Sequence, residues 1–140
     1  MDIDIIIPIY NAFDFVKKCI ETVIEHTDLT QHTLLLVNDK STDERILPLL
    51  NSFIKENQSL NIILIDNKDN QGFVRTVNIG MQYSHHDVVL LNSDTEVTRN
   101  WLSKIQNCAY SKPAVATVTP LSNNATLASV PIFLAENTIP

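Results

Sequence analysis

A nearly unbroken apolar run opens the chain and decides its fold: Ile3-Asp4-Ile5-Ile6-Ile7-Pro8-Ile9. Such a β-branched run is typical of a strand that is buried on both faces of a sheet. Apolar residues then recur at helical spacing from Val16 to Ile24, which predicts an amphipathic helix over about residues 14–26. A buried strand followed by a covering helix is the first half of a βαβ unit.

The same alternation continues along the chain. Further strands are expected over residues 33–37, 61–65, 87–91 and 114–118. Helices are expected after Ser41, after Gly72 and from Trp101 to Cys108. Strands that alternate with helices at this length predict an α/β fold with right-handed crossovers, a Rossmann-like three-layer sandwich around a mainly parallel sheet.

Three residues carry expectations about how the helices begin. Ser41 and Glu44 have the spacing of a capping box, which predicts that the second helix starts there. Pro48 would then lie beyond the first turn, so a kink or a restart is expected at this proline. Thr98 is in the right place to cap the helix that contains Trp101.

Composition limits the class of protein. The 140 residues, of which 44% are hydrophobic and 19% charged, fit one globular domain. The net charge of −6 disfavours nucleic acid as a partner. Cys19 and Cys108 lack the spacing of a zinc site or a disulfide framework, as expected of reduced thiols in a cytoplasmic protein. Without a signal-peptide pattern or an apolar run of about 20 residues, membrane association is expected only through parts outside this sequence.

Polar residues gather where the predicted strands end. Ligands of parallel α/β sheets bind beyond the carboxyl ends of the strands. The residues expected there are Pro8-Ile9-Tyr10-Asn11, Asn38-Asp39, Asp66-Asn67 and Asn92-Ser93-Asp94. The only glycines, Gly72 and Gly80, cannot build a dinucleotide fingerprint or a P-loop. A divalent cation, Mn²⁺ or Mg²⁺, is therefore expected to balance phosphate charge, with Asp94 as its first candidate ligand.

Asp39 is the second acidic candidate. With the strands ordered 3-2-1-4, Asp39 and Asp94 would lie two strand spacings apart, on the order of 10 Å. That gap suits a nucleoside at one end and a metal-bound diphosphate at the other, and a carboxylate can accept the ring N–H of a uracil or thymine. The alternative is that Asp39 and Asp43 only shape a turn and cap the second helix. The pattern favours neither interpretation.

The ordered set of motifs resembles glycosyltransferase family 2 over most of residues 3–120. The matching stretches are residues 5–12, residues 37–43, residues 70–73 with Asn78, and residues 90–97. The resemblance implies the GT-A fold and transfer of a sugar from a nucleotide diphosphate donor with inversion. Members of this family build polysaccharides, glycolipids and surface antigens, so the resemblance implies a saccharide or lipid-linked acceptor.

The resemblance also implies roles for individual residues. Pro8-Ile9-Tyr10-Asn11 would lie against the nucleoside, and Asp39 would pair with a pyrimidine base, which favours UDP or dTDP donors. Asp66 and Asn67 would line the same pocket. Asn92-Ser93-Asp94 occupies the D-x-D position, in which the last carboxylate binds the metal.

Three departures from the family pattern bear on activity. Asn92 stands where the first Asp of D-x-D is usual, and Val77 stands where an arginine is common. The general base that activates the acceptor hydroxyl is expected beyond Pro140, so the chain is interpreted as a truncated nucleotide-sugar-binding part, residues 1–140, without the acceptor half. The isolated chain is therefore expected to bind nucleotide and not to transfer sugar.

Functions of other classes were weighed against this interpretation. A phospho-acceptor receiver domain needs an acidic pair after the first strand, and a nucleotidyltransferase needs a glycine-rich basic loop there. Pro8-Ile9-Tyr10-Asn11 supplies neither. A non-catalytic nucleotide-binding domain that has lost transferase chemistry remains the alternative, because Asn92 removes one anionic group.

Overall fold

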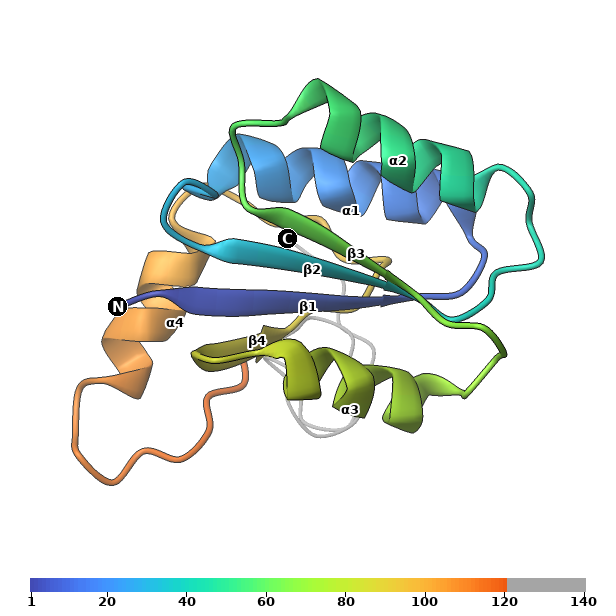
Figure 1. The fold of residues 1–140 in the computed structure, drawn as a ribbon. Helices are drawn as coiled ribbons and strands as arrows, with labels where there is room; N and C mark the ends of the chain where they lie inside the picture. The colour runs from blue at the N-terminus through green and yellow to red at the C-terminus, as the bar shows by residue number, and fades with distance from the viewer. Residues whose placement is uncertain (121–140) are drawn as a thin grey trace, which may run out of the picture. The chain divides into compact units, whose positions relative to one another are not determined.

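The computed structural model describes residues 1–120 of the chain, which divides into two compact units, Met1–Arg99 and Asn100–Pro140. The first unit is built on a four-stranded parallel sheet (Figure 1). Its strands are β1 (Ile3–Ile9), β2 (Thr33–Asn38), β3 (Ile62–Asp66) and β4 (Asp87–Leu90). They are arranged in the order β3-β2-β1-β4, which confirms the predicted order.

Helices cover both faces of this sheet. Those of the first unit are α1 (Phe13–His26), α2 (Ile46–Glu56) and α3 (Phe73–Tyr83). α1 and α2 lie on one face and α3 lies on the other, so the predicted three layers are confirmed (Figure 1). The second unit contains α4 (Trp101–Ala109).

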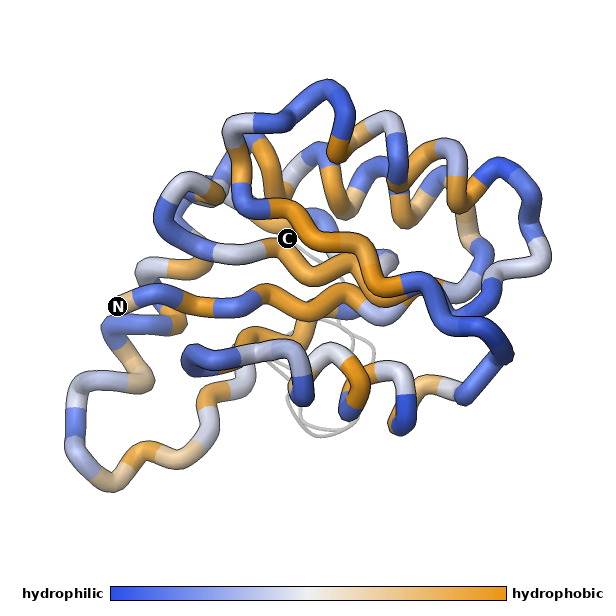
Figure 2. The backbone as a smooth tube through the Cα atoms, in the orientation of Figure 1, coloured by the Kyte–Doolittle hydropathy of each residue, from blue (hydrophilic) through white to orange (hydrophobic). Residues whose placement is uncertain are grey.

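β1 is the central strand, as its apolar run predicts. All seven of its residues are buried, because β2 and β4 flank it and helices cover both faces of the sheet. Its Ile6 stands in register with Leu35 of β2 and Leu90 of β4. Ile6, Leu35 and Val37 form a buried cluster, and the hydrophobic colouring of Figure 2 is concentrated along the strands.

Gly80 lets α3 approach the sheet closely. A Cβ atom at this position would lie 2.7 Å from Cγ2 of Ile6 and 3.2 Å from Cγ2 of Val37. Both neighbours are completely buried, so neither methyl group can move into solvent.

Gly80→Ala is expected to lower the free energy of unfolding by about 1–2 kcal/mol. Overpacking of this kind costs about 1–3 kcal/mol, and the better helix propensity of alanine offsets part of it. Urea unfolding followed by circular dichroism measures the change. Gln82→Ala, at an exposed position of the same helix, is the control and should stay within about 0.5 kcal/mol of the wild type. Equal stability of the two variants would contradict the close approach.

The expected start of the second helix is wrong. α2 begins at Ile46, with Arg45 as its N-cap residue and no capping hydrogen bond from a side chain. The N–H groups of Thr42 and Asp43 are bound instead by the side chain of Asn11, from a different loop. Pro48 is consequently the third residue of the helix, where its missing N–H has no intrahelical partner to lose, and no kink is needed.

Two further expectations concern residues 98–118 and are also wrong. α4 has Asn100, in a left-handed conformation, as its N-cap residue, without a side-chain capping bond, so Thr98 is not its cap. Residues 114–118 form no strand. Val115 N–H donates to the Lys112 carbonyl in a turn instead. The apolar residues of this stretch are not sufficient to form a strand, because β-propensity depends on context.

The amino end of β1 is fastened by two buried polar side chains. Ile3 N–H donates to Nδ1 of His32 at 3.2 Å, and His32 is 7% exposed. Asp4 accepts hydrogen bonds from Ser84 Oγ at 2.7 Å and from His85 N–H at 3.1 Å. Burial lowers the pKa of His32, although the charges of Asp28 and Asp2 partly oppose this.

The chain is expected to lose stability as the pH falls below about 6.5, the ordinary pKa of histidine. Because the folded-state pKa of His32 is lowered, the unfolded chain binds the proton more readily, and the contribution of neutral His32 is complete only above that pH. Urea midpoints at pH 7.5 and 5.5 measure the loss. In His32→Asn, whose amide oxygen accepts from Ile3 without titrating, the difference should shrink. An unchanged difference would assign the effect to other groups.

Among residues 1–120 no helix is long and apolar enough to cross a membrane.

Candidate functional site at the carboxyl edge of the sheet

The loops that leave the carboxyl ends of the strands are joined to one another through the backbone. Asp39 N–H donates to the Ile9 carbonyl at 2.8 Å, and Asn67 N–H donates to the Asn38 carbonyl at 2.9 Å. The loops after β2 and β3 are largely hydrophilic (Figure 2). The sheet thus brings the ends of β1, β2 and β3 together at one edge, as the sequence predicts.

Asn11 connects the loop after β1 to the loop after β2. Its Oδ1 accepts from Thr42 N–H at 2.8 Å and from Asp43 N–H at 2.9 Å, and its own N–H donates to Ser41 Oγ at 2.9 Å. Asn11 has a φ of 58°, a left-handed conformation that asparagine tolerates better than most residues. Its side chain is therefore engaged in holding two loops together.

Asp39 is a buried, multiply bonded side chain of this edge. Its Oδ1 accepts from Asn67 Nδ2 at 2.9 Å and from Gln71 N–H at 2.7 Å, and its Oδ2 accepts from Gly72 N–H at 2.9 Å. The residue is only 3% exposed. The carboxylate therefore ties the end of β2 to the end of β3 and to the N-terminus of α3.

These hydrogen bonds keep Asp39 ionised. Burial acts to raise its pKa, but the donors from Gln71, Asn67, Thr76 and Gly72 outweigh burial and hold the pKa below the usual range. An ionised carboxylate has about four acceptor positions, and these four donors from the chain match that number. A ligand N–H would therefore have to share a carboxylate oxygen with one of them.

Asp66 is the last residue of β3 and Asn67 follows it, so both lie at the predicted end of the strand. Asp66 is exposed, and its Oδ1 accepts from Nδ2 of buried Asn38 at 2.7 Å. Asn67 is 8% exposed and donates to Asp39. Of this predicted pair, only Asp66 presents its side chain to solvent.

Residues 8–11, at the end of β1, likewise include both buried and exposed side chains. Pro8 and Ile9 belong to β1 and are buried, so only their backbone is available at the edge. Tyr10 is 49% exposed and presents an aromatic ring within the stretch that is predicted to lie against the nucleoside. Its ligand role remains a prediction.

Asn92, Ser93 and Asp94 lie in the loop after β4. Asn92 and Asp94 are exposed and Ser93 is half-buried. Within the described part of the chain, no group of three or more histidine, cysteine or acidic side chains could hold a metal ion. A single exposed carboxylate still fits a hard cation such as Mn²⁺ or Mg²⁺, which completes its oxygen ligands with water and phosphate. The chain supplies one candidate ligand, Asp94, and no closed metal site.

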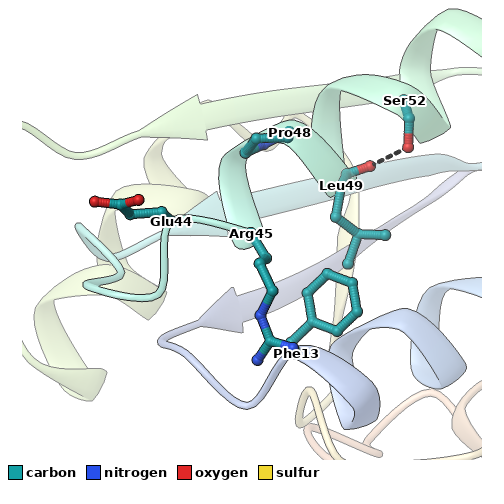
Figure 3. Close-up of a pocket in the computed structure, with 6 residues that line it drawn as sticks. All are labelled: Phe13, Glu44, Arg45, Pro48, Leu49 and Ser52. Atoms are coloured by element: carbon teal, nitrogen blue, oxygen red, sulfur yellow. Dashed lines mark hydrogen bonds between the residues drawn. The ribbon is translucent and has the colours of Figure 1, made fainter.

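An open pocket of about 570 Å³ lies beside this edge, between the start of α1 and the first turns of α2. It is lined by Phe13, Glu44, Arg45, Pro48, Leu49 and Ser52 (Figure 3). The Arg45 guanidinium stands 4.4 Å from the centre of the Phe13 ring and also pairs with Asp43 at 2.7 Å. None of the lining residues was predicted as a site residue. The one basic residue that lines the pocket, Arg45, already pairs with Asp43, so the pocket offers a phosphate no unpaired positive charge.

Sequence reasoning missed the partners of Asp39. Thr76, in the first turns of α3, lies 3.4 Å from Asn67 Nδ2 and is 1% exposed, and Gly72 has a φ of 76°. That conformation favours glycine and allows the Gly72 N–H to face the carboxylate. The sequence signal for these partners was the polar stretch before Gly72. The sequence shows that this stretch precedes α3, but not that it contacts Asp39.

Comparisons with known proteins agree on one family. The profile described as "Glycosyl transferase family 2" matches residues 4–129. The polypeptide N-acetylgalactosaminyltransferase 11 of Xenopus tropicalis is 31% identical over 104 residues, which cover 72% of this chain and 17% of that protein.

Solved structures show the same fold. The mannosyltransferase PcManGT from Pyrobaculum calidifontis, in complex with GDP-Man and Mn²⁺, has a TM-score of 0.73 at 17% identity, over 79% of this chain and 32% of that one. GalNAc-T7 with UDP, GalNAc and Mn²⁺ has a TM-score of 0.65 at 22% identity, over 74% and 20% of the two chains. These likenesses confirm the GT-A type of fold.

The chain spans about a third or less of the length of each of these relatives. The family profile nevertheless covers nearly all of its 140 residues. The chain therefore belongs to glycosyl transferase family 2.

Proposed function

We propose that the chain is the donor-binding part of an enzyme that transfers a sugar from a UDP- or dTDP-type donor to an acceptor hydroxyl, with inversion. A divalent cation, Mn²⁺ or Mg²⁺, would stabilise the leaving diphosphate. The observation that carries the proposal is the edge of the sheet, where Asp39, Asp66 and Asp94 lie at or beyond the ends of three different strands. The relatives that were solved with nucleotides and Mn²⁺ support it.

In this proposal the chain's own residues bind and orient the donor. Tyr10 stacks on the base, and a carboxylate oxygen of Asp39, shared with its donors from the chain, receives the ring N–H of a pyrimidine. Asp66 and Asn92 present hydrogen-bonding groups at the same edge, and Asp94 is the protein ligand of the cation. Attack by the acceptor needs a general base, which is proposed to lie outside this chain.

Calorimetric titration of the 140-residue chain with UDP, dTDP and GDP, each with and without Mn²⁺, tests the proposal. UDP and dTDP are expected to bind at least about tenfold more tightly with Mn²⁺ than without it, a difference of roughly 1.4 kcal/mol. GDP is expected to bind more weakly, because its base presents other groups to Asp39. Nucleotide affinity that is independent of metal would overturn the donor site as drawn.

A second candidate is a nucleotide-binding domain without transferase chemistry. Asn92 favours it, because a neutral amide stands where a second carboxylate would strengthen metal binding. The two candidates differ in the titration, since the non-catalytic domain would bind nucleotide with little gain from Mn²⁺. Sugar transfer by the isolated chain would exclude this second candidate and contradict the proposed location of the base.

A further inference from the structure

The loop that carries Asp94 is an exposed arch between two buried ends. Leu91 before it and Val97 after it are 8% and 6% exposed, whereas Asn92, Asp94 and Glu96 are exposed. Leu91 N–H donates to the Ile6 carbonyl at 2.9 Å, which fixes the start of the arch to β1. The contacts that hold the other residues of the arch therefore determine which positions the Asp94 carboxylate can reach.

Two residues of α1, one helical turn apart, hold the arch at both ends. The thiol of Cys19 lies 3.6 Å from the carbonyl oxygen of Asn92 and donates to it. Val97 N–H donates to Oγ1 of Thr22 at 3.2 Å. Cys19 is completely buried and Thr22 is 8% exposed, so neither contact competes with bulk water.

The geometry of Thr22 leaves its hydroxyl a single arrangement. Its proton is donated to the carbonyl of Cys19 at 3.0 Å, so a lone pair is directed at Val97 N–H. A hydroxyl is well suited to this position because it donates and accepts at once. The backbone of α1 thereby fixes the side chain that fixes the end of the arch.

Cys19 can keep its donor role at any ordinary pH. Burial raises the pKa of its thiol to about 12, with the charge of Asp94 acting in the same direction and a hydrogen bond from Thr95 N–H opposing it. The thiol is therefore protonated and available to the Asn92 carbonyl. The contact with the arch is shown by the distance from the thiol to the Asn92 carbonyl oxygen. The raised pKa shows only that the thiol keeps its proton.

We infer that Thr22, with Cys19, is a positioning residue for the metal-binding loop: its hydrogen bond to Val97 sets the reach of Asp94 toward a metal-bound diphosphate. The inference rests on the proposed function, in which Asp94 is the metal ligand. Metal ligands must be held within about 0.5 Å of a productive geometry, and Asp94 is an exposed residue of the arch. The arch is held by α1, which supplies none of the residues proposed to bind metal or nucleotide.

Thr22→Val and Thr22→Ser form a matched pair of variants. Valine keeps the shape of threonine and removes the acceptor, whereas serine keeps the hydroxyl. For each variant, UDP affinity is measured by calorimetry with and without Mn²⁺, well below the melting temperature. In Thr22→Val the Mn²⁺-dependent gain is expected to fall about tenfold, roughly the worth of one buried hydrogen bond, while metal-free UDP binding is unchanged. Thr22→Ser is expected to restore the gain.

The outcomes separate this inference from the proposed function. If the wild-type chain shows no gain from Mn²⁺, the proposed function fails. If the wild type shows the gain and Thr22→Val keeps it, or loses metal-free binding equally, Thr22 is not a positioning residue. Should Thr22→Val fail to fold, Cys19→Ala takes its place, with Cys19→Ser as the variant that keeps a donor. An unaltered Mn²⁺-dependent gain in Cys19→Ala would then overturn the inference.

Discussion

Asp39→Ala is expected to destabilise the chain by about 3 kcal/mol, the largest effect of any exchange at the candidate site. The exchange leaves Gln71 N–H, Gly72 N–H and Asn67 Nδ2 without their acceptor. Each buried donor that loses its partner costs about 1–3 kcal/mol, and relaxation of the loop toward water reduces the sum. Urea unfolding measures the change in the free energy of unfolding.

Two variants make the Asp39 result specific. Asp39→Asn keeps one acceptor oxygen but turns an NH₂ group toward a backbone donor, so it is expected to lose at least half as much stability as Asp39→Ala. Asp69→Ala removes an exposed carboxylate from the neighbouring loop and should change stability by less than about 0.5 kcal/mol. If Asp39→Ala is as stable as Asp69→Ala, the hydrogen-bonded network does not hold the loops.

The wild-type chain can show whether Asp39 also contacts a base. UDP methylated at the ring N3 lacks the N–H that Asp39 is proposed to accept. Its affinity is expected to fall at least about tenfold relative to UDP, because an ionised acceptor bonds more strongly than a neutral one. Equal affinities would restrict Asp39 to its structural role.

Asp94→Ala has the second large expected effect, on binding and not on stability. The exchange is expected to abolish most of the Mn²⁺-dependent gain in UDP affinity, at least about tenfold. The free energy of unfolding should stay within about 0.5 kcal/mol of the wild type, because Asp94 is exposed. Calorimetric titration with UDP, with and without Mn²⁺, measures the first quantity and urea unfolding the second.

Neighbouring residues supply the comparison for Asp94. Glu96→Ala, two residues later in the same exposed loop, should leave the gain from Mn²⁺ in place. Asn92→Asp should increase the gain, because a second carboxylate adds a hard oxygen ligand. A loss of the gain in Glu96→Ala with no loss in Asp94→Ala would move the metal ligand to Glu96.

The three layers and the interior position of β1 could be predicted because they depend on patterns that the chain carries locally. The run from Ile3 to Ile9 is buried on both faces, and that burial requires flanking strands and two covering layers. The residues at which helices and strands begin and end were harder to predict. The Ser41 N–H, which a local capping box would have used, donates to Asn38 Oδ1 instead. Asn11, about thirty residues away in sequence, binds the next two N–H groups, so α2 starts only at Ile46.

The candidate site could be predicted from the sequence to a similar extent. Its position at the carboxyl edge followed from the parallel sheet, and the acidic residues followed from where the strands end. The burial of Asp39 did not follow, because its donors come from the loop before α3 and from the Gly72 backbone conformation. Thr22 and Cys19 gave no signal, because at helical spacing they are indistinguishable from residues that only fill the core.

The contacts of Asn11 and Asp39 have a consequence for how a nucleotide would be recognised. Three loops are tied together in the free chain, so their ordering is completed during folding and not during association. Induced fit is then confined to exposed side chains such as Tyr10. Structures with and without nucleotide should superimpose closely over the loops after β1, β2 and β3. At constant solvent viscosity, the association rate should vary little from one donor sugar to another.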